Sequence, residues 1–537
     1  MTGRLLLVVV GAIVCAPAAA RADRAGFGEL GGDATVSSFA GPRDGVAIDL
    51  TGGLRVRGEA LYNLDLDRGL TPSGEPLFPV PIADPDDQTF TTADMRLRTD
   101  LTIRAPGSGV GVTVRVDVLD NLVLGSTPES GTGRAPTPAA SPGQSPPADA
   151  FRIKRAYGEA LTPFGTLAVG RMGSQWGLGL VANGGDCGDC DGGDAADRIA
   201  FATPIAGHIW AAAYDFSATG PTARRRDDAR AIDIEPTDDV QSVTLALLRY
   251  RTDLARARRS RADRISVEYG AYLSHRWQDN DIPADYLRTA QPQPLDSLQV
   301  MARGYRATAV DGWLRLTLPR GRVELEAAVL TASVDQASLV PGVLFEAPVE
   351  STQLGAALES EVAVAGAWSI GFDTGYASGD AAPGFGAFPP PNAPAGEPGE
   401  LDGPQANPPF DNTVDNFRFH PDYRVDRVLF REIIGTVTDA YYLRPHVTVA
   451  LVDVGRARLT VSVAAIASWA VEPASTPSGS RGLGLEIDPT VRYETTDGFI
   501  AVLEHGVLFP LSGLDNPEQG LDARTAQVWR LRLGFDF

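Results

Sequence analysis

The sequence predicts an all-β protein, a transmembrane antiparallel β-barrel of about 18 strands with short periplasmic turns and long external loops. Three observations predict this fold class. The segment 524–537 alternates apolar and polar residues and ends in Phe537. The connections between strand candidates alternate between short and long, which is typical of outer-membrane barrels. Residues 1–22 have the pattern of a secretory signal peptide.

The C-terminal segment has two faces when it is read with a period of two. One face carries Gln527, Trp529, Leu531, Leu533, Phe535 and Phe537, and the other carries Val528, Arg530, Arg532, Gly534 and Asp536. This alternation predicts a β-strand with one apolar and one wet side. An edge strand of a soluble sandwich is the alternative interpretation. In a barrel, we expect this strand to pair with the strand near 47–65 and to turn its apolar face to lipid.

The N-terminus and the composition predict an exported protein. A basic start, an apolar run and small residues identify 1–22 as a signal peptide. A lipoprotein signal anchored at Cys15 is disfavoured, because Val14 is bulky where that signal has a small residue. Residues 23–46 then form an N-terminal periplasmic segment, too short for a plug domain, and 47–537 form the barrel. The net charge of -21 disfavours a nucleic-acid partner.

Strand candidates cover most of the mature chain. They lie near 47–65, 90–105, 109–122, 151–162, 164–172, 197–205, 207–217, 239–252, 264–278, 299–318, 320–334, 350–365, 366–379, 440–452, 456–471, 482–495, 498–508 and 524–537. Joints of two to four residues, such as 163–164 and 319–320, alternate with long connections such as 123–150. The connection 253–263 breaks this alternation, because it should be a short turn and is not. The even number of strands predicts that both termini lie in the periplasm.

The predicted wet faces carry arginines at a spacing of two. The candidate lumen or selectivity residues are Arg55, Arg57, Arg96, Arg98, Arg104, Arg115, Glu324, Arg530 and Arg532. Acids of the same faces include Glu59, Asp100, Asp117, Glu326 and Asp536. The charges predict a ladder of ion pairs along the wall, or a transverse field that guides a polar or anionic solute. The two interpretations are compatible.

The loop 173–196 contains the two cysteines that remain after removal of the signal. We expect a disulfide between Cys187 and Cys190, since the compartment is oxidising and a zinc ribbon would need a second pair. The carboxylates Asp186, Asp189, Asp191 and Asp194 could hold a calcium ion, although the spacing is not that of an EF-hand loop. A solvated acidic loop, or a loop that folds into the channel and narrows it, is the favoured interpretation.

The connection 380–439 is the longest and has two parts. Residues 381–409 are rich in proline and glycine and predict an irregular or mobile segment. Residues 411–435 are aromatic, and apolar residues near helical spacing predict a short helix that ends at Gly435. This part either dips into the lumen or packs as a cap on the external rim; the sequence leaves both open.

Enzyme motifs are missing from the sequence. The histidines His208, His275, His420, His446 and His505 are scattered, and neither Gly-x-Ser-x-Gly nor His-Glu-x-x-His occurs. We therefore expect no enzyme, with a barrel-embedded hydrolase as an alternative.

Several stretches resemble known families. The signal peptide, the eighteen-strand layout and the Phe537 end resemble porin-like outer-membrane β-barrels, including large barrels of the alginate-export type. Residues 170–179 with the cysteine loop, 419–435 and 506–510 resemble an uncharacterised outer-membrane family of deltaproteobacteria and myxobacteria. The resemblance implies the fold and a location in the cell outer membrane, and no substrate or catalytic residue.

The expected function is a channel for passive diffusion of small polar or anionic solutes. A structural or surface-binding barrel whose lumen is closed by 380–439 is the alternative. The expected partners are outer-membrane lipids, the barrel-assembly machinery that reads Phe537, and small polar solutes. The oligomeric state stays open, and no cofactor other than calcium is considered.

Overall fold

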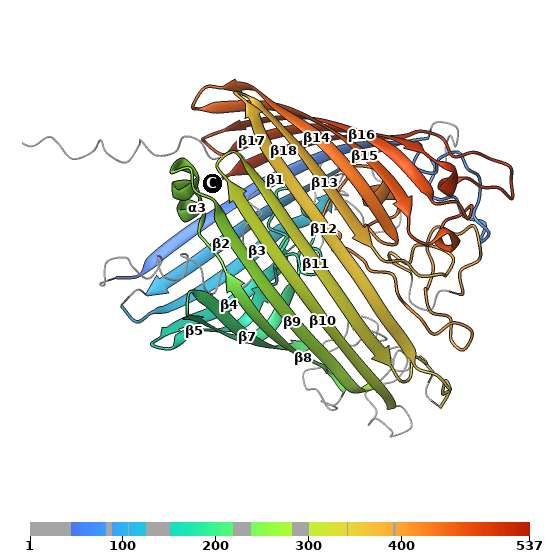
Figure 1. Ribbon diagram of the computed structural model, residues 1–537, viewed down its shortest axis with the longest axis horizontal. Helices are drawn as coiled ribbons and strands as arrows, with labels where there is room; N and C mark the ends of the chain where they lie inside the picture. Colours follow the sequence, from blue (N-terminus) through green and yellow to red (C-terminus); the bar gives the residue numbers. More distant parts are fainter. Residues whose placement is uncertain are drawn as a thin grey trace, which may run out of the picture.

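The described part of the chain forms a closed antiparallel β-barrel (Figure 1). The computed structural model describes residues 45–81, 88–105, 107–124, 151–217, 238–281, 300–340, 342–389 and 394–537. The predicted signal peptide and residues 23–44 of the predicted N-terminal segment lie outside these ranges. The first described strand begins at Ala47, where the sequence predicts the start of the barrel.

Eighteen strands make the wall within the described residues. They are β1 (Ala47–Tyr62), β2 (Thr89–Ala105), β3 (Val110–Val123), β4 (Phe151–Thr162), β5 (Gly165–Gly173), β6 (Ala195–Ile205), β7 (His208–Ser217), β8 (Val240–Arg249), β9 (Ser266–Asp281), β10 (Met301–Leu318), β11 (Gly321–Val334), β12 (Val349–Ala365), β13 (Trp368–Ala377), β14 (Ala440–Asp453), β15 (Ala457–Ala470), β16 (Gly482–Thr495), β17 (Phe499–Pro510) and β18 (Ala526–Asp536). Each strand pairs with the next, and β18 pairs with β1. The predicted fold class and number of strands are confirmed.

The seam between β1 and β18 closes the barrel as predicted. In its register Leu54 lies opposite Phe535, and the backbone N–H of Phe537 donates to the carbonyl of Gly52 at 2.9 Å. Trp529 and Leu531 on the outer face are 46% and 47% exposed, whereas Arg530 on the inner face is 1% exposed. The period-two pattern of this strand therefore separates lipid from lumen.

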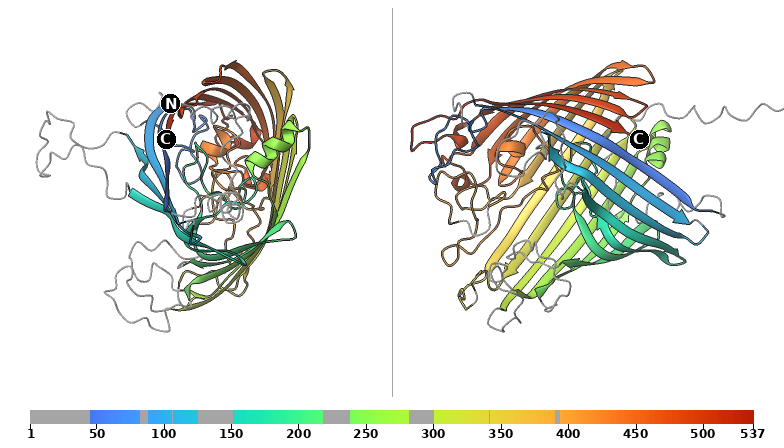
Figure 2. Two further views of the ribbon diagram at one scale, coloured as in Figure 1. Left: turned by 90° about the vertical axis from the view of Figure 1, so that its left-hand side faces the viewer. Right: turned by 180° about the vertical axis from the view of Figure 1, so that it is seen from behind.

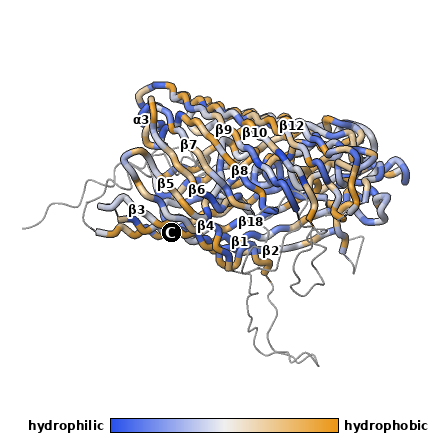
Figure 3. Tube along the Cα trace, turned by 90° about the horizontal axis from the view of Figure 1, so that it is seen from below, coloured by the Kyte–Doolittle hydropathy of each residue, from blue (hydrophilic) through white to orange (hydrophobic). Residues whose placement is uncertain are grey.

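The rest of the wall repeats this separation, and hydrophobic and hydrophilic residues alternate along the strands (Figure 3). Trp210, Trp368 and Tyr441 are exposed on the outside, where aromatic residues anchor a barrel at the membrane interfaces. Other aromatic residues of the wall and its loops, such as Trp313 and Tyr442, are buried in the lumen. An apolar exterior around a charged interior is the architecture of an outer-membrane barrel, in agreement with the predicted location.

Two connections fill much of the lumen (Figure 2). One is the loop 174–194 between β5 and β6, and the other is the connection 378–439 between β13 and β14. Phe385 and Phe419 of the second connection are 0% and 1% exposed. Residues 381–389 and 394–409 are irregular, as predicted, and burial of the Phe385 ring and its neighbours fixes part of this backbone.

The inner wall accommodates this packing through small residues. A Cβ atom at Gly355 of β12 would lie 2.2 Å from the ring of Phe417, so only glycine lets this ring approach the wall. Ala357, Ala440 and Ala464 also face the buried cluster. Residues 411–439 therefore dip into the lumen; they are not a cap on the rim.

Helices are few and short. The predicted helix before Gly435 is a single π-helical turn, η4 (Leu429–Ile433). The irregular connection between β8 and β9 contains α3 (Asp253–Arg261). In the described ranges, no helix has the length and the apolar character that crossing a membrane requires.

Candidate functional site

The loop 174–194 forms the centre of a charged constriction. Glycines bring together the two chain segments that flank its tip, 186–191: Gly185 has φ +68°, and a Cβ atom there would lie 2.4 Å from the carbonyl oxygen of Gly192. Only glycine tolerates both this backbone conformation and this close approach. A disulfide joins Cys187 and Cys190, whose Cα atoms are 5.1 Å apart. The tip of the loop, 186–191, is thereby presented as a compact turn to the wall.

Three pairs of arginines lie directly opposite each other on the wall beside this tip, and one of them is Arg115 of β3 with Arg155 of β4. Arg57 of β1 faces Arg532 of β18 across the seam, and Arg55 of β1 faces Arg96 of β2. Like charges in direct register destabilise a sheet. Each pair therefore needs a negative or accepting group between its members.

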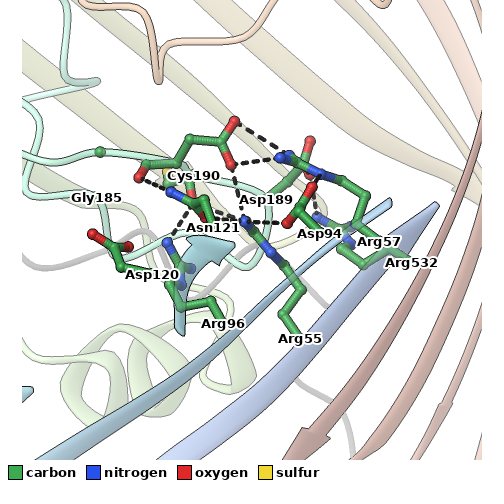
Figure 4. A network of polar contacts seen from close by, with 12 residues as sticks. Arg55, Arg57, Asp94, Arg96, Asp120, Asn121, Gly185, Asp189, Cys190 and Arg532 are labelled. Atoms are coloured by element: carbon green, nitrogen blue, oxygen red, sulfur yellow. Dashed lines mark hydrogen bonds and ion pairs between the residues drawn. The ribbon is translucent and has the colours of Figure 1, made fainter. Parts of the chain in front are cut away.

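The loop supplies one acceptor to each pair (Figure 4). Asp189 lies 3.4 Å from Arg57 and 3.2 Å from Arg532, and it also binds Arg431. The carbonyl oxygen of Cys190 accepts hydrogen bonds from Arg55 at 2.9 Å and Arg96 at 2.8 Å. The tip thus adds acceptors to arginines that the wall pairs only in part, through Asp94 beside Arg55 and Arg57.

Further carboxylates of the loop bind further arginines. Asp191 lies 3.0 Å from Arg55 and 2.9 Å from Arg57. Asp186 lies 3.1 Å from Arg155 and also binds Arg115. Burial alone would raise the pKa of Asp186, but the nearby Arg155 and Arg115 outweigh it and lower the pKa to about 2. Asp186 is therefore seated as a carboxylate.

The wall also contains the predicted ladder of ion pairs. Arg98 donates to both carboxylate oxygens of Asp117 at 2.7 Å, and Arg115 lies 2.6 Å from Asp100. Arg57 lies 2.7 Å from Asp94. These pairs fix the directions of the guanidinium groups, which leaves their remaining N–H donors for the loop.

The opposite side of the loop is held by hydrogen bonds from its backbone to a buried carboxyl group. Glu326 of β11, which is 0% exposed, accepts hydrogen bonds from three consecutive backbone N–H groups, those of Leu178, Gly179 at 3.0 Å and Leu180 at 3.2 Å. The indole of Trp176 donates to Asp311 of β10 at 3.0 Å. One buried carboxyl group thus satisfies the backbone of a whole turn.

Hydrogen bonds of the same kind anchor the connection 378–439. Glu486 of β16 accepts from the backbone N–H groups of Arg427, Val428 and Leu429 at 2.8, 2.8 and 3.1 Å. From this anchored segment, Asp422 accepts from the N–H groups of Asp191 and Gly192 at 2.8 and 3.1 Å. The two inward connections are therefore joined to each other as well as to the wall.

Two cavities border the point at which these connections meet. One has a volume of about 440 Å³ and is lined by Arg57, Arg424 and Arg431 among others. The second has a volume of about 320 Å³, and its lining includes Arg315, Arg322 and Arg532. Residues 422–424 line both cavities, so this segment separates them.

The predicted site residues fall into two groups. The structure brings together Arg55, Arg57, Arg96, Arg98, Arg115, Arg532, Asp186, Asp189, Asp191, Cys187 and Cys190. Arg530 lies beside them and binds Glu59 and Glu432. Arg104 is apart, 3.8 Å from Glu159, and Glu324 lies across the lumen, where it binds Arg315 at 2.8 Å.

The calcium hypothesis finds no support in the contacts. Asp186, Asp189 and Asp191 bind arginines, and Asp194 is half exposed, with an oxygen 3.5 Å from His420. No group of three potential ligand residues that could hold a metal ion occurs in the described part of the chain.

Sequence reasoning missed Asp94, Arg155, Arg424 and Arg431 as parts of the site. Asp94 shares the face of Arg96 and Arg98, so the spacing of two already contained its signal. Arg155 had no such signal, because a register shift in the pairing of β3 with β4 interrupts the alternation there.

Comparisons with known proteins reach only the level of the fold. No family model matches the chain, and no curated protein matches it either. OccK11 of Pseudomonas aeruginosa is 9% identical with a TM-score of 0.44, over 91% of this chain and 96% of that one. An anion-selective porin of Comamonas acidovorans is 10% identical with a TM-score of 0.39, over 92% and 100%. The outer membrane channel DcaP of Acinetobacter baumannii is 11% identical with a TM-score of 0.36, over 92% and 98%.

Likenesses this distant do not indicate a solute. The narrower resemblance to a deltaproteobacterial and myxobacterial family stays a prediction, since none of these matches tests it.

Proposed function

We propose that the protein is an outer-membrane channel that passes small polar or anionic solutes through the constriction between the loop 174–194 and the wall. The observation that carries the proposal is that arginines line both cavities beside the constriction, together with carboxylates, most of which are ion-paired with arginines. A solute that moved from one cavity to the other would meet Arg424, which lines both. Guanidinium groups fixed in a narrow lumen attract anions, and the carboxylates paired with them weaken this attraction, so the expected solutes are small and polar or anionic.

A specific observation favours a second candidate, a structural or surface-binding barrel with a closed lumen. The carboxylates of the loop already bind the arginines of the wall, and the connection 378–439 is packed by buried aromatic residues. Under this candidate the constriction never opens.

The histidines do not add support for a hydrolase. His275 and His505 stack on Trp277 and Trp529, and His208 is hydrogen-bonded to the hydroxyl of Tyr269 at 2.8 Å. His446 lies 3.4 Å from Asp373, but in the part of the chain that the structure describes no serine hydroxyl is hydrogen-bonded to it.

Conductance in planar bilayers separates the two remaining candidates. The channel predicts unitary currents from the refolded protein and an anion-selective reversal potential in a KCl gradient. The double variant Arg424→Gln/Arg532→Gln should lose much of this selectivity, whereas Arg456→Gln, an exposed arginine in a turn outside the constriction, should keep it. Absence of current, even after 380–439 is replaced by a short linker, would leave the closed barrel.

A further inference from the structure

The connection between β8 and β9 differs from the other joints at its end of the barrel. It contains α3, whereas the described connections 206–207 and 319–320 are two-residue turns. Around the helix the chain carries seven arginines: Arg249, Arg251, Arg256, Arg258, Arg259, Arg261 and Arg264. Asp253 and Asp263 are the acids of the connection 250–265. This concentration of positive charge stands out in a chain with a net charge of -21.

The helix is fixed to the inner edge of the wall. Arg256 lies 3.0 Å from Glu268, a residue of β9 with 0% exposure that also accepts from the backbone N–H of Arg251 at 2.8 Å. The hydroxyl of Thr252 caps the helix by accepting from Ala255 at 3.2 Å. The helix thus has a defined place at the mouth of the barrel, at the end where the C-terminus lies (Figure 2).

The lumen lies on the same side of the wall as the anchor of the helix. Glu268 belongs to the inner face of β9, which also includes Gly270, against which Trp176 packs. The helix is therefore tied to the lumen side of the wall, which is the side from which a solute leaves or enters.

The remaining charges of the helix are available to solutes. Arg258, Arg261 and Arg264 are exposed. Within the described residues, the ion pairs of the helix involve Arg256 alone, with Asp253 and Glu268. Arg258 and Arg261 lie in its last turn, where positive charge is stabilised by the helix dipole. Their positions at the mouth therefore carry no structural penalty.

We propose that α3 is a cationic site that concentrates small anions at the periplasmic mouth. This inference rests on the proposed channel function and adds a sidedness to it. Exposed charges act over about 10 Å at 0.1 M salt and about 3 Å at 1 M. When the salt on the side of the helix is dilute, the helix should therefore increase the permeability of the channel to anions. When the salt on that side is concentrated, the helix should have almost no effect on ion selectivity.

A KCl gradient of 1 M against 0.1 M across a planar bilayer tests the sidedness. Channels insert in both directions, so single channels of the wild type should fall into two populations of reversal potential. The triple variant Arg258→Gln/Arg261→Gln/Arg264→Gln should shift only the population whose helix faces 0.1 M KCl, by roughly a twofold loss of anion-over-cation permeability. Both populations should coincide with the wild type when the dilute side is raised to 1 M.

Arg456→Gln is the matched control, because Arg456 is an exposed arginine in another turn at the same end. It should leave both populations in place. The inference is overturned if neither population of the triple variant shifts, if both shift equally, or if the control produces the same shift. If the channels conduct and their selectivity does not depend on the helix, only this inference is wrong. If the wild type carries no current, the proposed function is wrong as well.

Discussion

The two halves of the loop 174–194 are held against the wall by different chemistry. Residues 178–180 present backbone N–H groups to the single carboxyl group of Glu326. Residues 186–191 present carboxylates and a carbonyl to many arginines of β1, β2, β3, β4 and β18. In the first half, one carboxyl group accepts all three of these N–H groups, whereas the second half distributes its contacts over a network in which most groups have several partners.

This difference predicts unequal sensitivity to mutation and to pH. Loss of the Glu326 carboxyl group leaves three backbone N–H groups without their acceptor at once. Loss of one arginine leaves each aspartate another arginine. Ionisation matters for the second half, because its acceptors are carboxylates, while a protonated carboxyl group can still accept a backbone hydrogen bond.

The largest effect is expected from Glu326→Ala. The N–H groups of Leu178, Gly179 and Leu180 would remain buried without an acceptor, at a cost of roughly 5 kcal/mol in total. We expect hydrogen exchange of these three amides to rise strongly and the loop to leave its seat. Glu326→Gln keeps an acceptor oxygen in place and should retain most of the protection. Unchanged exchange in the alanine variant would contradict the role of this carboxyl group.

Asp189→Asn should have a smaller effect, of about 3 kcal/mol on the free energy of unfolding in urea. This substitution removes the carboxylate that binds both Arg57 and Arg532, and Arg57 keeps Asp94 and Asp191. Arg57→Met is the informative partner variant, since it removes one arginine of the facing pair and leaves Asp189 with Arg431 and Arg532. We expect it to cost about 1 kcal/mol. An equal cost for both variants would argue against repulsion at the seam.

As the pH is lowered, residues 186–191 should lose their contacts with the wall before residues 178–180 do. The pKa of Asp186 is lowered to about 2 in the seated loop, although burial opposes this, because Arg155 and Arg115 favour the carboxylate. Its contribution to seating is therefore complete above its ordinary pKa of 3.8 and is lost as the pH falls towards 2. Hydrogen exchange measured from pH 5 to pH 2, after correction for the intrinsic rate, should show loss of protection at 186–191 while 178–180 stay protected. Simultaneous loss in both halves would remove the distinction.

The smallest effect is expected from removal of the disulfide. Cys187 and Cys190 close a very short ring, so the double variant Cys187→Ser/Cys190→Ser should lose at most about 2 kcal/mol. Arg55 and Arg96 bind the backbone carbonyl of residue 190, which the substitution leaves in place. Conductance should therefore be close to that of the wild type, and a large change would mean that the ring itself, rather than the arginines, shapes the tip.

Local signals explain why the wall could be predicted. Alternation along β18 and the lengths of the connections depend on nearby residues, and they gave the number of strands, the closing seam and the lumen side of Arg57 and Arg532. The connection 253–263, which did not fit, contains α3. The pairing of Asp189 with Arg532 had no such signal, because it joins a glycine-shaped loop to a strand more than 300 residues away.

The role of Glu326 was equally hidden. Its place on a wet face followed from the alternation, but the partners of its carboxyl group are backbone N–H groups of another segment. Every residue except proline has a backbone N–H group, so the side-chain pattern does not predict which of these groups a carboxyl group will bind. The burial of Phe385 was missed for a related reason. A composition rich in proline and glycine predicts an irregular backbone, but it does not predict which surface a single aromatic ring will pack against.

The facing arginines of β1 and β18 have a consequence for how the barrel is assembled. Arg57 and Arg532 come from the first and last described strands, while the aspartate between them comes from a loop in the first half of the chain. Seating of that loop therefore favours closure of the seam, and closure of the seam in turn completes the seat of the loop. Closure of the wall and placement of the constriction are coupled, so a variant that weakens one is expected to weaken the other.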